Sequence, residues 1–200
     1  MMFLLRRLLI PLVVLVGLFV VADRVALHFA ERDVAKRLQA DAHTSTTPGV
    51  SIHGFPFLTQ LIAGKFGSVD IDMHGVDAGA VRISRLTVHV HDAHVSISDV
   101  IRQTSSQIHV QRATSQLLLT YDDIGRVLPA QIRDRVPNLA RAVVRSASVT
   151  AADTISLATQ FGDIPVRLPG LPFGIHLTGA KATDAGIVVD GEAKGLVVPS

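Results

Sequence analysis

An alternation of apolar and polar residues runs through most of the chain beyond residue 50. In one clear example, Val69, Ile71 and Met73 are separated by Asp70 and Asp72. Successive side chains of a β-strand point to opposite faces of a sheet, so this period of two predicts strands that bury one apolar face. The same signal recurs at residues 50–52, 86–91, 108–110, 143–149, 155–157, 164–168, 175–177 and 187–189. Because few segments between these strands could form the long helices that parallel crossovers require, the sequence predicts an antiparallel sheet in an α+β domain over residues 50–200.

Three segments have helical patterns, and the shortest runs from Leu58 to Lys65. Residues 23–41 carry apolar side chains at helical spacing on one stripe and charged side chains elsewhere, which predicts an amphipathic helix. A polar stretch at residues 42–49 then predicts a linker. A third helix is expected to start near Tyr121, because Thr120 and Asp123 have the spacing of a capping box.

The chain opens with a segment that is first basic and then apolar, over residues 1–22. Arg6 and Arg7 precede fifteen residues without a charge, Leu8 to Ala22. A helix of that length spans about 22 Å, which fits the apolar part of a secretory signal but falls short of the ~30 Å hydrocarbon core of a bilayer. We therefore expect either a cleaved export signal or, with tilt and bilayer thinning, an uncleaved membrane anchor. A buried core helix is a third alternative, which the charges at both edges disfavour.

Composition narrows the classes of function. Both units of the formal net charge of +2 come from Arg6 and Arg7, so the remainder of the chain is neutral. With no tryptophan and one tyrosine, the chain also lacks the stacking aromatic side chains that accompany clustered lysine and arginine in a nucleic-acid binder. The absence of cysteine excludes disulfides, thiolate metal sites and a cysteine nucleophile.

An unusually apolar turn lies between two glycines, Gly54 and Gly64. It reads Gly-Phe-Pro-Phe-Leu-Thr-Gln-Leu-Ile-Ala-Gly, and its five large apolar residues are Phe55, Phe57, Leu58, Leu61 and Ile62. Turns ordinarily run over the protein surface and carry polar residues. We therefore expect this segment to plug a core, to contact a membrane or to line a cavity for an apolar ligand.

The best candidate for a metal site is the histidine group His89, His91 and His94. Alternate residues of a strand would project His89 and His91 to one side, and His94 could fold round from the next turn to give zinc three nitrogen ligands. The alternative is the hydrated face of a half-buried strand, which the nine scattered histidines favour. Asp70 and Asp72 likewise fit the polar positions of their strand. The sequence has no serine-hydrolase, phosphate-binding or zinc-protease motif, and we expect neither an enzyme nor a cofactor.

Five arginines fall within twenty residues. They could contact anionic lipid head groups at a membrane surface, or they could form the solvated face of a helix, which is the commoner meaning of such spacing. These residues are Arg126, Arg133, Arg135, Arg141 and Arg145.

Taken in order, several of these segments resemble the actinobacterial LmeA-like phospholipid-binding family. The resemblance rests on the export segment, on Ala-Asp-Arg-Val from Ala22, on the apolar turn between Gly54 and Gly64, and on Val-Asp-Ile-Asp-Met-His-Gly-Val from Val69. It covers most of the chain and brings no catalytic motif. It implies an envelope protein that faces a periplasm-like space, binds phospholipid and is connected with maturation of mannosylated lipoglycans. It also implies a tubular architecture, in which a long, curved antiparallel sheet wraps a helix and leaves an apolar channel.

These observations predict a noncatalytic phospholipid-binding protein of the cell envelope, with lipid transfer as an open extension. The residues expected to contact acyl chains are Phe55, Phe57, Leu58, Leu61 and Ile62 at a mouth, and Val69, Ile71 and Met73 along the lining. The alternative is that these side chains only close the end of a solid core. One rival function is a scaffold that recruits envelope glycosyltransferases and holds no lipid, and a less favoured one is a metal-dependent hydrolase built on the three histidines.

Overall fold

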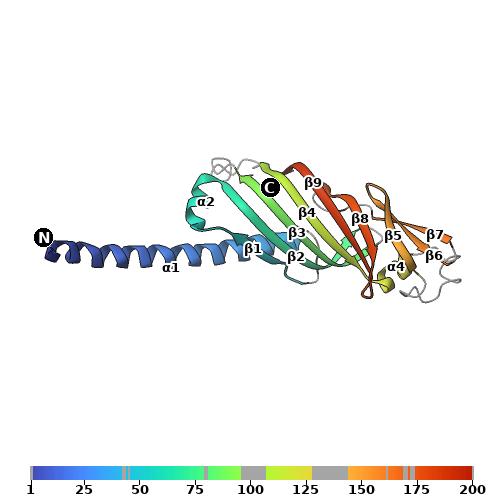
Figure 1. The fold of residues 1–200 in the computed structure, drawn as a ribbon, viewed down its shortest axis with the longest axis horizontal. Coiled ribbons are helices and arrows are strands. Elements are labelled where there is room, and N and C mark those ends of the chain that lie inside the picture. The colour runs from blue at the N-terminus through green and yellow to red at the C-terminus, as the bar shows by residue number, and fades with distance from the viewer. Residues whose placement is uncertain are drawn as a thin grey trace.

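The computed structural model describes residues 2–41, 44, 46–78, 81–95, 107–127, 144–160, 162–168, 171 and 174–199. It has one long N-terminal helix followed by two antiparallel sheets (Figure 1). The larger sheet has the strand order β1-β2-β3-β4-β9-β8, and the smaller one has the order β5-β6-β7. The prediction of an α+β fold built on a long, curved antiparallel sheet is confirmed.

The elements have the following bounds. The helices are α1 (Met2–Asp41), α2 (Phe57–Ala63) and α4 (Tyr121–Val127). The larger sheet contains β1 (Gly49–His53), β2 (Lys65–Ala78), β3 (Val81–Val95), β4 (Gln107–Leu119), β8 (His176–Ala182) and β9 (Ile187–Pro199). The smaller sheet contains β5 (Val144–Ala151), β6 (Thr154–Thr159) and β7 (Gly162–Arg167).

The larger sheet is bent where the alternation of its buried residues is interrupted. On β3 the buried residues Ile83 and Leu86 are three positions apart instead of two, and they are paired with Val76 and Met73 of β2, which are also three apart. Gly75, between this second pair, has a φ of 65°, a left-handed conformation that glycine adopts without strain.

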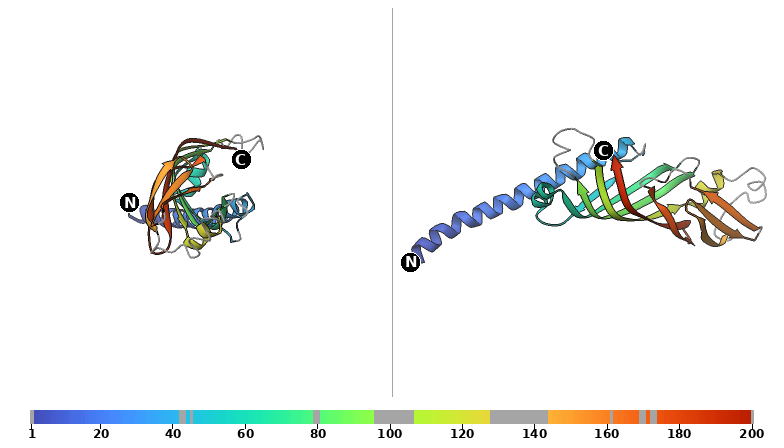
Figure 2. Two further views of the ribbon diagram at one scale, coloured as in Figure 1. Left: turned by 90° about the vertical axis from the view of Figure 1, so that its right-hand side faces the viewer. Right: turned by 90° about the horizontal axis from the view of Figure 1, so that it is seen from above.

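A second interruption crosses the sheet nearer its other end. Asp92 of β3 and Gly195 of β9 have φ values of 52° and 62°, and between them on β4 the buried residues Val110 and Ala113 are again three apart. Because both interruptions fall on paired positions of neighbouring strands, buried residues stay opposite buried residues while the strands bend. Figure 2 shows the resulting curvature, which gives the sheet an inner and an outer face.

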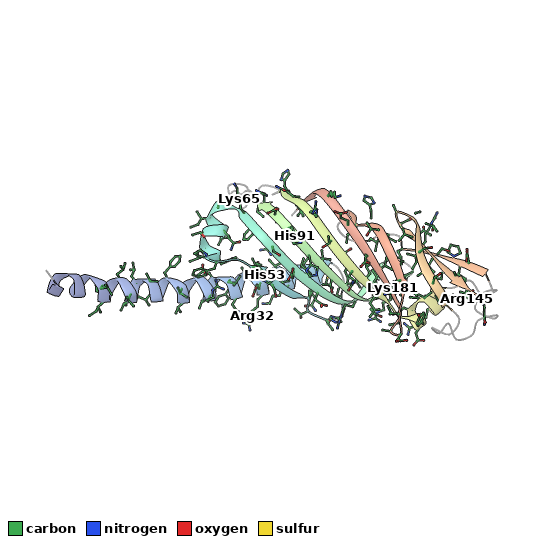
Figure 3. The ribbon with its side chains drawn as sticks, viewed as in Figure 1. Arg32, His53, Lys65, His91, Arg145 and Lys181 are labelled. Atoms are coloured by element: carbon green, nitrogen blue, oxygen red, sulfur yellow. The ribbon has the colours of Figure 1, made fainter. Side chains whose placement is uncertain are left out.

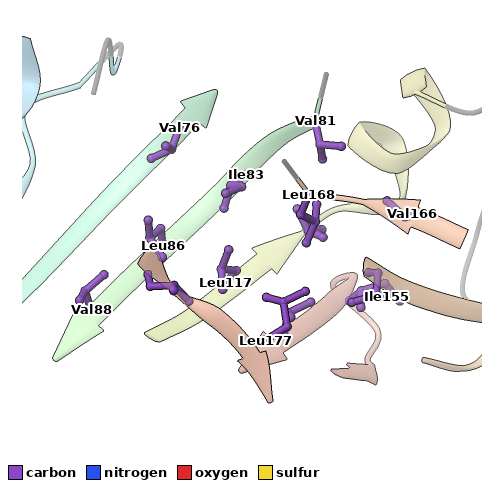
Figure 4. Packing of buried hydrophobic residues seen from close by; sticks show 14 of the residues in the cluster. Val76, Val81, Ile83, Leu86, Val88, Leu117, Ile155, Val166, Leu168 and Leu177 are labelled. Carbon is purple, nitrogen blue, oxygen red and sulfur yellow. The ribbon is translucent and has the colours of Figure 1, made fainter. Parts of the chain in front are cut away.

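The inner face of the larger sheet and the smaller sheet share one hydrophobic core (Figure 4). Its fully buried members include Ile83, Leu86 and Leu117 from the larger sheet and Ile155 and Leu157 from the smaller one. Full burial of such a side chain contributes about 1.5–3 kcal/mol. The two sheets are therefore held together by apolar packing, as expected for a chain without disulfides.

Helix α1 projects from the sheets at its N-terminal end and packs against them at its C-terminal end (Figure 1). Side chains 9–22 are exposed, whereas Ala35 is buried and Leu38 packs on the core. Glu31 Oε1 accepts a hydrogen bond from the backbone N–H of Ile52 in β1, with a donor–acceptor distance of 2.9 Å. The segments predicted as an export signal and as an amphipathic helix thus form one continuous helix.

By length and composition, α1 is the one helix among the described residues that could cross a membrane. Only 6% of its most apolar window is buried against the rest of the protein. A signal sequence near an N-terminus has the same properties. The helix therefore fits both the cleaved signal and the uncleaved anchor.

The predicted start of α4 is confirmed. The backbone N–H of Asp123 donates to Thr120 Oγ1 at 3.3 Å, and the hydroxyl groups of Thr120 and Ser84 both donate to the Asp123 carboxylate. Arg126 also pairs with this carboxylate at 3.1 Å. Burial by itself would raise the pKa of Asp123, but the two hydroxyl hydrogen bonds and the arginine charge outweigh burial and hold the pKa below its ordinary value.

Candidate functional site

Helix α2 carries the apolar turn and is fixed to the sheet by one side. Phe57 is only 1% exposed, and its ring centroid lies 6.3 Å from that of Phe66 in β2. Gly64 ends the helix with a left-handed φ of 65°, and its carbonyl accepts a hydrogen bond from the N–H of Val95 in β3 at 2.8 Å. The helix is thereby attached to the end of the β2–β3 pair.

The other side of the turn is apolar and exposed. Phe55, Leu61 and Ile62 are 61%, 42% and 79% exposed, while Leu58 is half-buried. Single apolar residues on a surface need no explanation, but three on one short segment form a patch of the kind that marks a binding surface. Phe57 therefore packs as part of the core, whereas the three exposed residues are available to contact a membrane or an apolar ligand.

A buried carboxylate on α1 fixes the first turn of α2. Asp23 is 0% exposed, its Oδ1 accepts a hydrogen bond from the N–H of Leu58 at 2.8 Å, and its Oδ2 pairs with Arg24 at 2.8 Å. The guanidinium carbon of Arg24 lies 5.1 Å from the ring centroid of Phe55, within the range of a cation–π contact. Sequence reasoning missed this contact because its partners are 35 residues apart. The only local signal was a charged pair at the end of the apolar run.

The residues predicted to line an apolar channel lie on the inner face of the larger sheet. Ile71 and Met73 are buried members of the core, and Val69 is partly buried against them. On the same face, β3 continues the apolar surface with Leu86 and Val88, which are paired with Met73 and Ile71. The structure thus brings the three predicted lining residues together.

A patch of small residues lies on the paired strands β4 and β9 of this face. Ala113 is opposite Ala193, and Ser115 is opposite Gly191, against which Ile175 packs closely. Ser115 is 5% exposed, and its Oγ has no hydrogen-bond partner among the residues that the structure describes. Sequence reasoning missed this small-residue patch because alanine, serine and glycine contribute little to an apolar alternation.

The three histidines predicted as metal ligands are on β3 and do not converge. His89 and His53 each lie 2.8 Å from the carboxylate of Asp70, and His94 bonds a backbone oxygen. The hydrogen bond with His89, followed by that with His53, lowers the pKa of Asp70 despite partial burial. His91, which Figure 3 labels on the larger sheet, lines a depression of about 490 Å³ together with Asp92, Gln111, Arg112 and Thr114. Within the described ranges, no group of three His, Asp or Glu side chains could hold a metal ion.

Of the five arginines predicted to contact head groups, the structure describes two. Arg126 pairs with Asp123, and Arg145 is exposed at the start of β5. Figure 3 places Arg145 at the opposite end of the long axis from the N-terminal part of α1, so any head-group contact there is separate from a membrane that α1 would cross. The other three lie outside the described residues: Arg133, Arg135 and Arg141.

The fold and site define a class of α+β protein. It combines an apolar helix of membrane-spanning composition, a bent sheet with an apolar inner face, and an exposed apolar turn. The LmeA-like phospholipid-binding family matches residues 21–163, which is more than half of the chain. The chain belongs to this family. No curated protein and no solved structure matched it. Membership in the family supports binding of lipid, and the matched region contains α2, the Asp23 contact and strands β2 to β4.

Proposed function

We propose that this protein is a noncatalytic phospholipid-binding protein whose acyl-chain site is the inner face of the larger sheet. The observation that carries the proposal is the continuous apolar face of β2, β3, β4 and β9 in a member of a phospholipid-binding family. The pairing of Ala113 with Ala193 supports it, because alanine leaves more room beside a strand than leucine or isoleucine do. Ser115 adds one buried hydroxyl that could donate to an ester carbonyl of the lipid.

The energetics of a phospholipid favour a long curved face over a surface patch. Moving about 30 acyl methylenes from water into an apolar site contributes roughly 0.8 kcal/mol each, which is more than 20 kcal/mol of transfer free energy in total. A shallow groove cannot shelter that much apolar surface. Strands β2 and β3 have 14 and 15 residues, and at about 3.3 Å per residue they extend for some 45 Å, long enough to lie along whole acyl chains.

Helix α2 is proposed as the mouth of this site. It sits at the end of the β2–β3 pair, where Phe57 closes the core and Leu58, Leu61 and Ile62 line the route that an acyl chain would take toward Val69. A short helix held by a few contacts is suited to such a gate, because local opening requires only those contacts to break.

The proposed setting is the cell envelope. Helix α1 would export the domain to a periplasm-like space and, if it is not cleaved, hold it at the membrane surface. This proposal has three extensions. They are a role in lipoglycan and envelope biogenesis, lipid transfer between membranes, and contact with envelope glycosyltransferases.

Native mass spectrometry of the full chain, after extensive detergent washing, tests the proposal. We expect close to one phospholipid per chain, identified after extraction. Replacing both Leu58 and Leu61 with Asp should leave the protein soluble in detergent but lower lipid occupancy severalfold, whereas Thr59→Asp on the same helix should not. A wild-type protein recovered without lipid would contradict the proposal and favour the scaffold.

A further inference from the structure

We propose that α2 and the part of α1 that follows Asp23 lie in the membrane interface, so that the protein is seated on the bilayer by an apolar shoulder as well as by its span. We define the apolar shoulder as Val25, Phe29, Phe55, Leu61 and Ile62, which are 49%, 65%, 61%, 42% and 79% exposed. The inference rests on the anchor alternative of the proposed function and is independent of where lipid binds inside the domain.

The charges that end the apolar run of α1 are shielded from water or held in an interfacial arrangement. Asp23 is fully buried between Arg24 and the backbone N–H at the start of α2. Arg24, half exposed, pairs with this carboxylate and lies over an aromatic ring, as arginines do where a protein crosses from lipid to head groups. The next ionisable residues on α1 are His28, which is exposed, and then Glu31 and Arg32. The polar boundary of α1 is therefore set near residue 28 and not at Asp23.

Helix length supports the same boundary. Leu8 to Ala22 is 15 residues, or about 22 Å at 1.5 Å per residue, which leaves roughly 8 Å of a 30 Å hydrocarbon core without apolar helix. Leu8 to Leu27 is 20 residues, or about 30 Å, which spans the core and leaves His28 and Phe29 at the interface. Seating the shoulder in the interface thus removes the mismatch that a boundary at Ala22 would create.

The surface at this level is apolar on both sides of α1. Val21, Val25 and Phe29 recur every four residues and form an exposed stripe that continues the surface of the span. On the side of Asp23, the apolar turn between Gly54 and Gly64 covers the carboxylate and presents Phe55 and Ile62 to the outside. Figures 1 and 2 show α2 beside α1 at the end of the sheets that faces the projecting part of the helix. A lipid surface is the occupant that this continuity with an apolar span favours.

Depth-dependent fluorescence quenching tests the inference on the full chain in phosphatidylcholine vesicles. The chain has no cysteine and no tryptophan, so one introduced cysteine carries an environment-sensitive dye without interference. Ile62→Cys and Phe29→Cys report from the two parts of the shoulder, and Ser148→Cys, exposed on β5 at the far end, is the matched control. We expect iodide to quench the first two dyes at least fivefold less than the control, and lipids with a spin label near the head group to quench only the first two.

Equal iodide quenching at Phe29, Ile62 and Ser148 would overturn the inference. Phe29 keeps the test valid if Ile62→Cys disturbs α2, because Phe29 is exposed on α1 and takes no part in the proposed mouth. Its shielding also separates contact with the bilayer from shielding by a lipid bound inside the domain. Lipid occupancy measured on the same samples shows separately whether the proposed function holds.

Discussion

Ala113→Leu should distinguish a closed core from a lipid-contact surface on the inner face of the larger sheet. Ala113 is 2% exposed and lies between Val90 on β3 and Ala193 on β9. The substitution adds three carbons at the small-residue patch. In a closed core those carbons overpack the site and lower the free energy of unfolding by about 1–3 kcal/mol. Where an acyl chain occupies the space, the lipid-free protein accepts the three carbons without overpacking, so its free energy of unfolding should not fall and could rise by up to about 2.4 kcal/mol, at roughly 0.8 kcal/mol per buried carbon.

The assay is phospholipid phosphate per chain after purification, combined with urea unfolding of the delipidated protein. We expect Ala113→Leu to lower lipid content severalfold while the midpoint of unfolding does not fall below that of the wild type. Ala147→Leu is the matched control, since it makes the same change on β5, where Ala147 packs against the core away from the proposed acyl-chain site. Unchanged lipid content together with a loss of 1–3 kcal/mol in Ala113→Leu would refute the reasoning.

The remaining predictions concern two buried polar side chains. Ser115→Ala removes an Oγ that has no hydrogen-bond partner among the described residues. The free energy of unfolding of the lipid-free protein, measured by urea unfolding, should therefore stay the same or rise by about 1 kcal/mol. The affinity for lipid should fall. A loss of stability in Ser115→Ala would show that the hydroxyl has a structural partner. Asp123→Asn weakens the contacts from Ser84, Thr120 and Arg126 and should cost about 1.5–3 kcal/mol at neutral pH, measured by urea unfolding. Because the folded-state pKa of Asp123 lies below its ordinary value of 3.8, its contribution is complete above that value and is lost as the pH falls through the lowered pKa. The stability difference between wild type and Asp123→Asn should therefore shrink below pH 3.8, and a difference independent of pH would contradict the assigned charge.

Sequence patterns predicted the parts of this fold that depend on interactions between residues close together in the chain. The alternation around Ile71 predicted a strand because a half-buried strand needs a period of two, and the Thr120–Asp123 spacing predicted the start of α4 because capping is a contact within one turn. The bends of the sheet were less accessible. At a bend such as the one at Gly75, the alternation of buried residues shifts on neighbouring strands at positions that are paired. A single sequence does not show which strands are neighbours or which positions are paired.

The candidate site was predicted only in outline. The apolar turn identified α2, but its composition could not show that Phe57 would be buried and Ile62 exposed, since that division depends on how the helix docks. The contact from Asp23 to the N–H of Leu58 depends on the path of the whole chain between them. For the same reason, the close spacing of His89, His91 and His94 on β3 carried no information about whether their side chains would meet.

Photo-crosslinking with a phospholipid that carries a diazirine in its acyl chain tests the central claim most directly. The full chain is reconstituted in vesicles, irradiated and digested, and the crosslinked peptides are identified by mass spectrometry. We expect crosslinks on the inner face of β2, β3 and β4, at residues such as Met73, Val88 and Ala113, in addition to those on α1. Crosslinks confined to α1 and α2, with none on the inner face of the sheet, would contradict a lipid site within the domain.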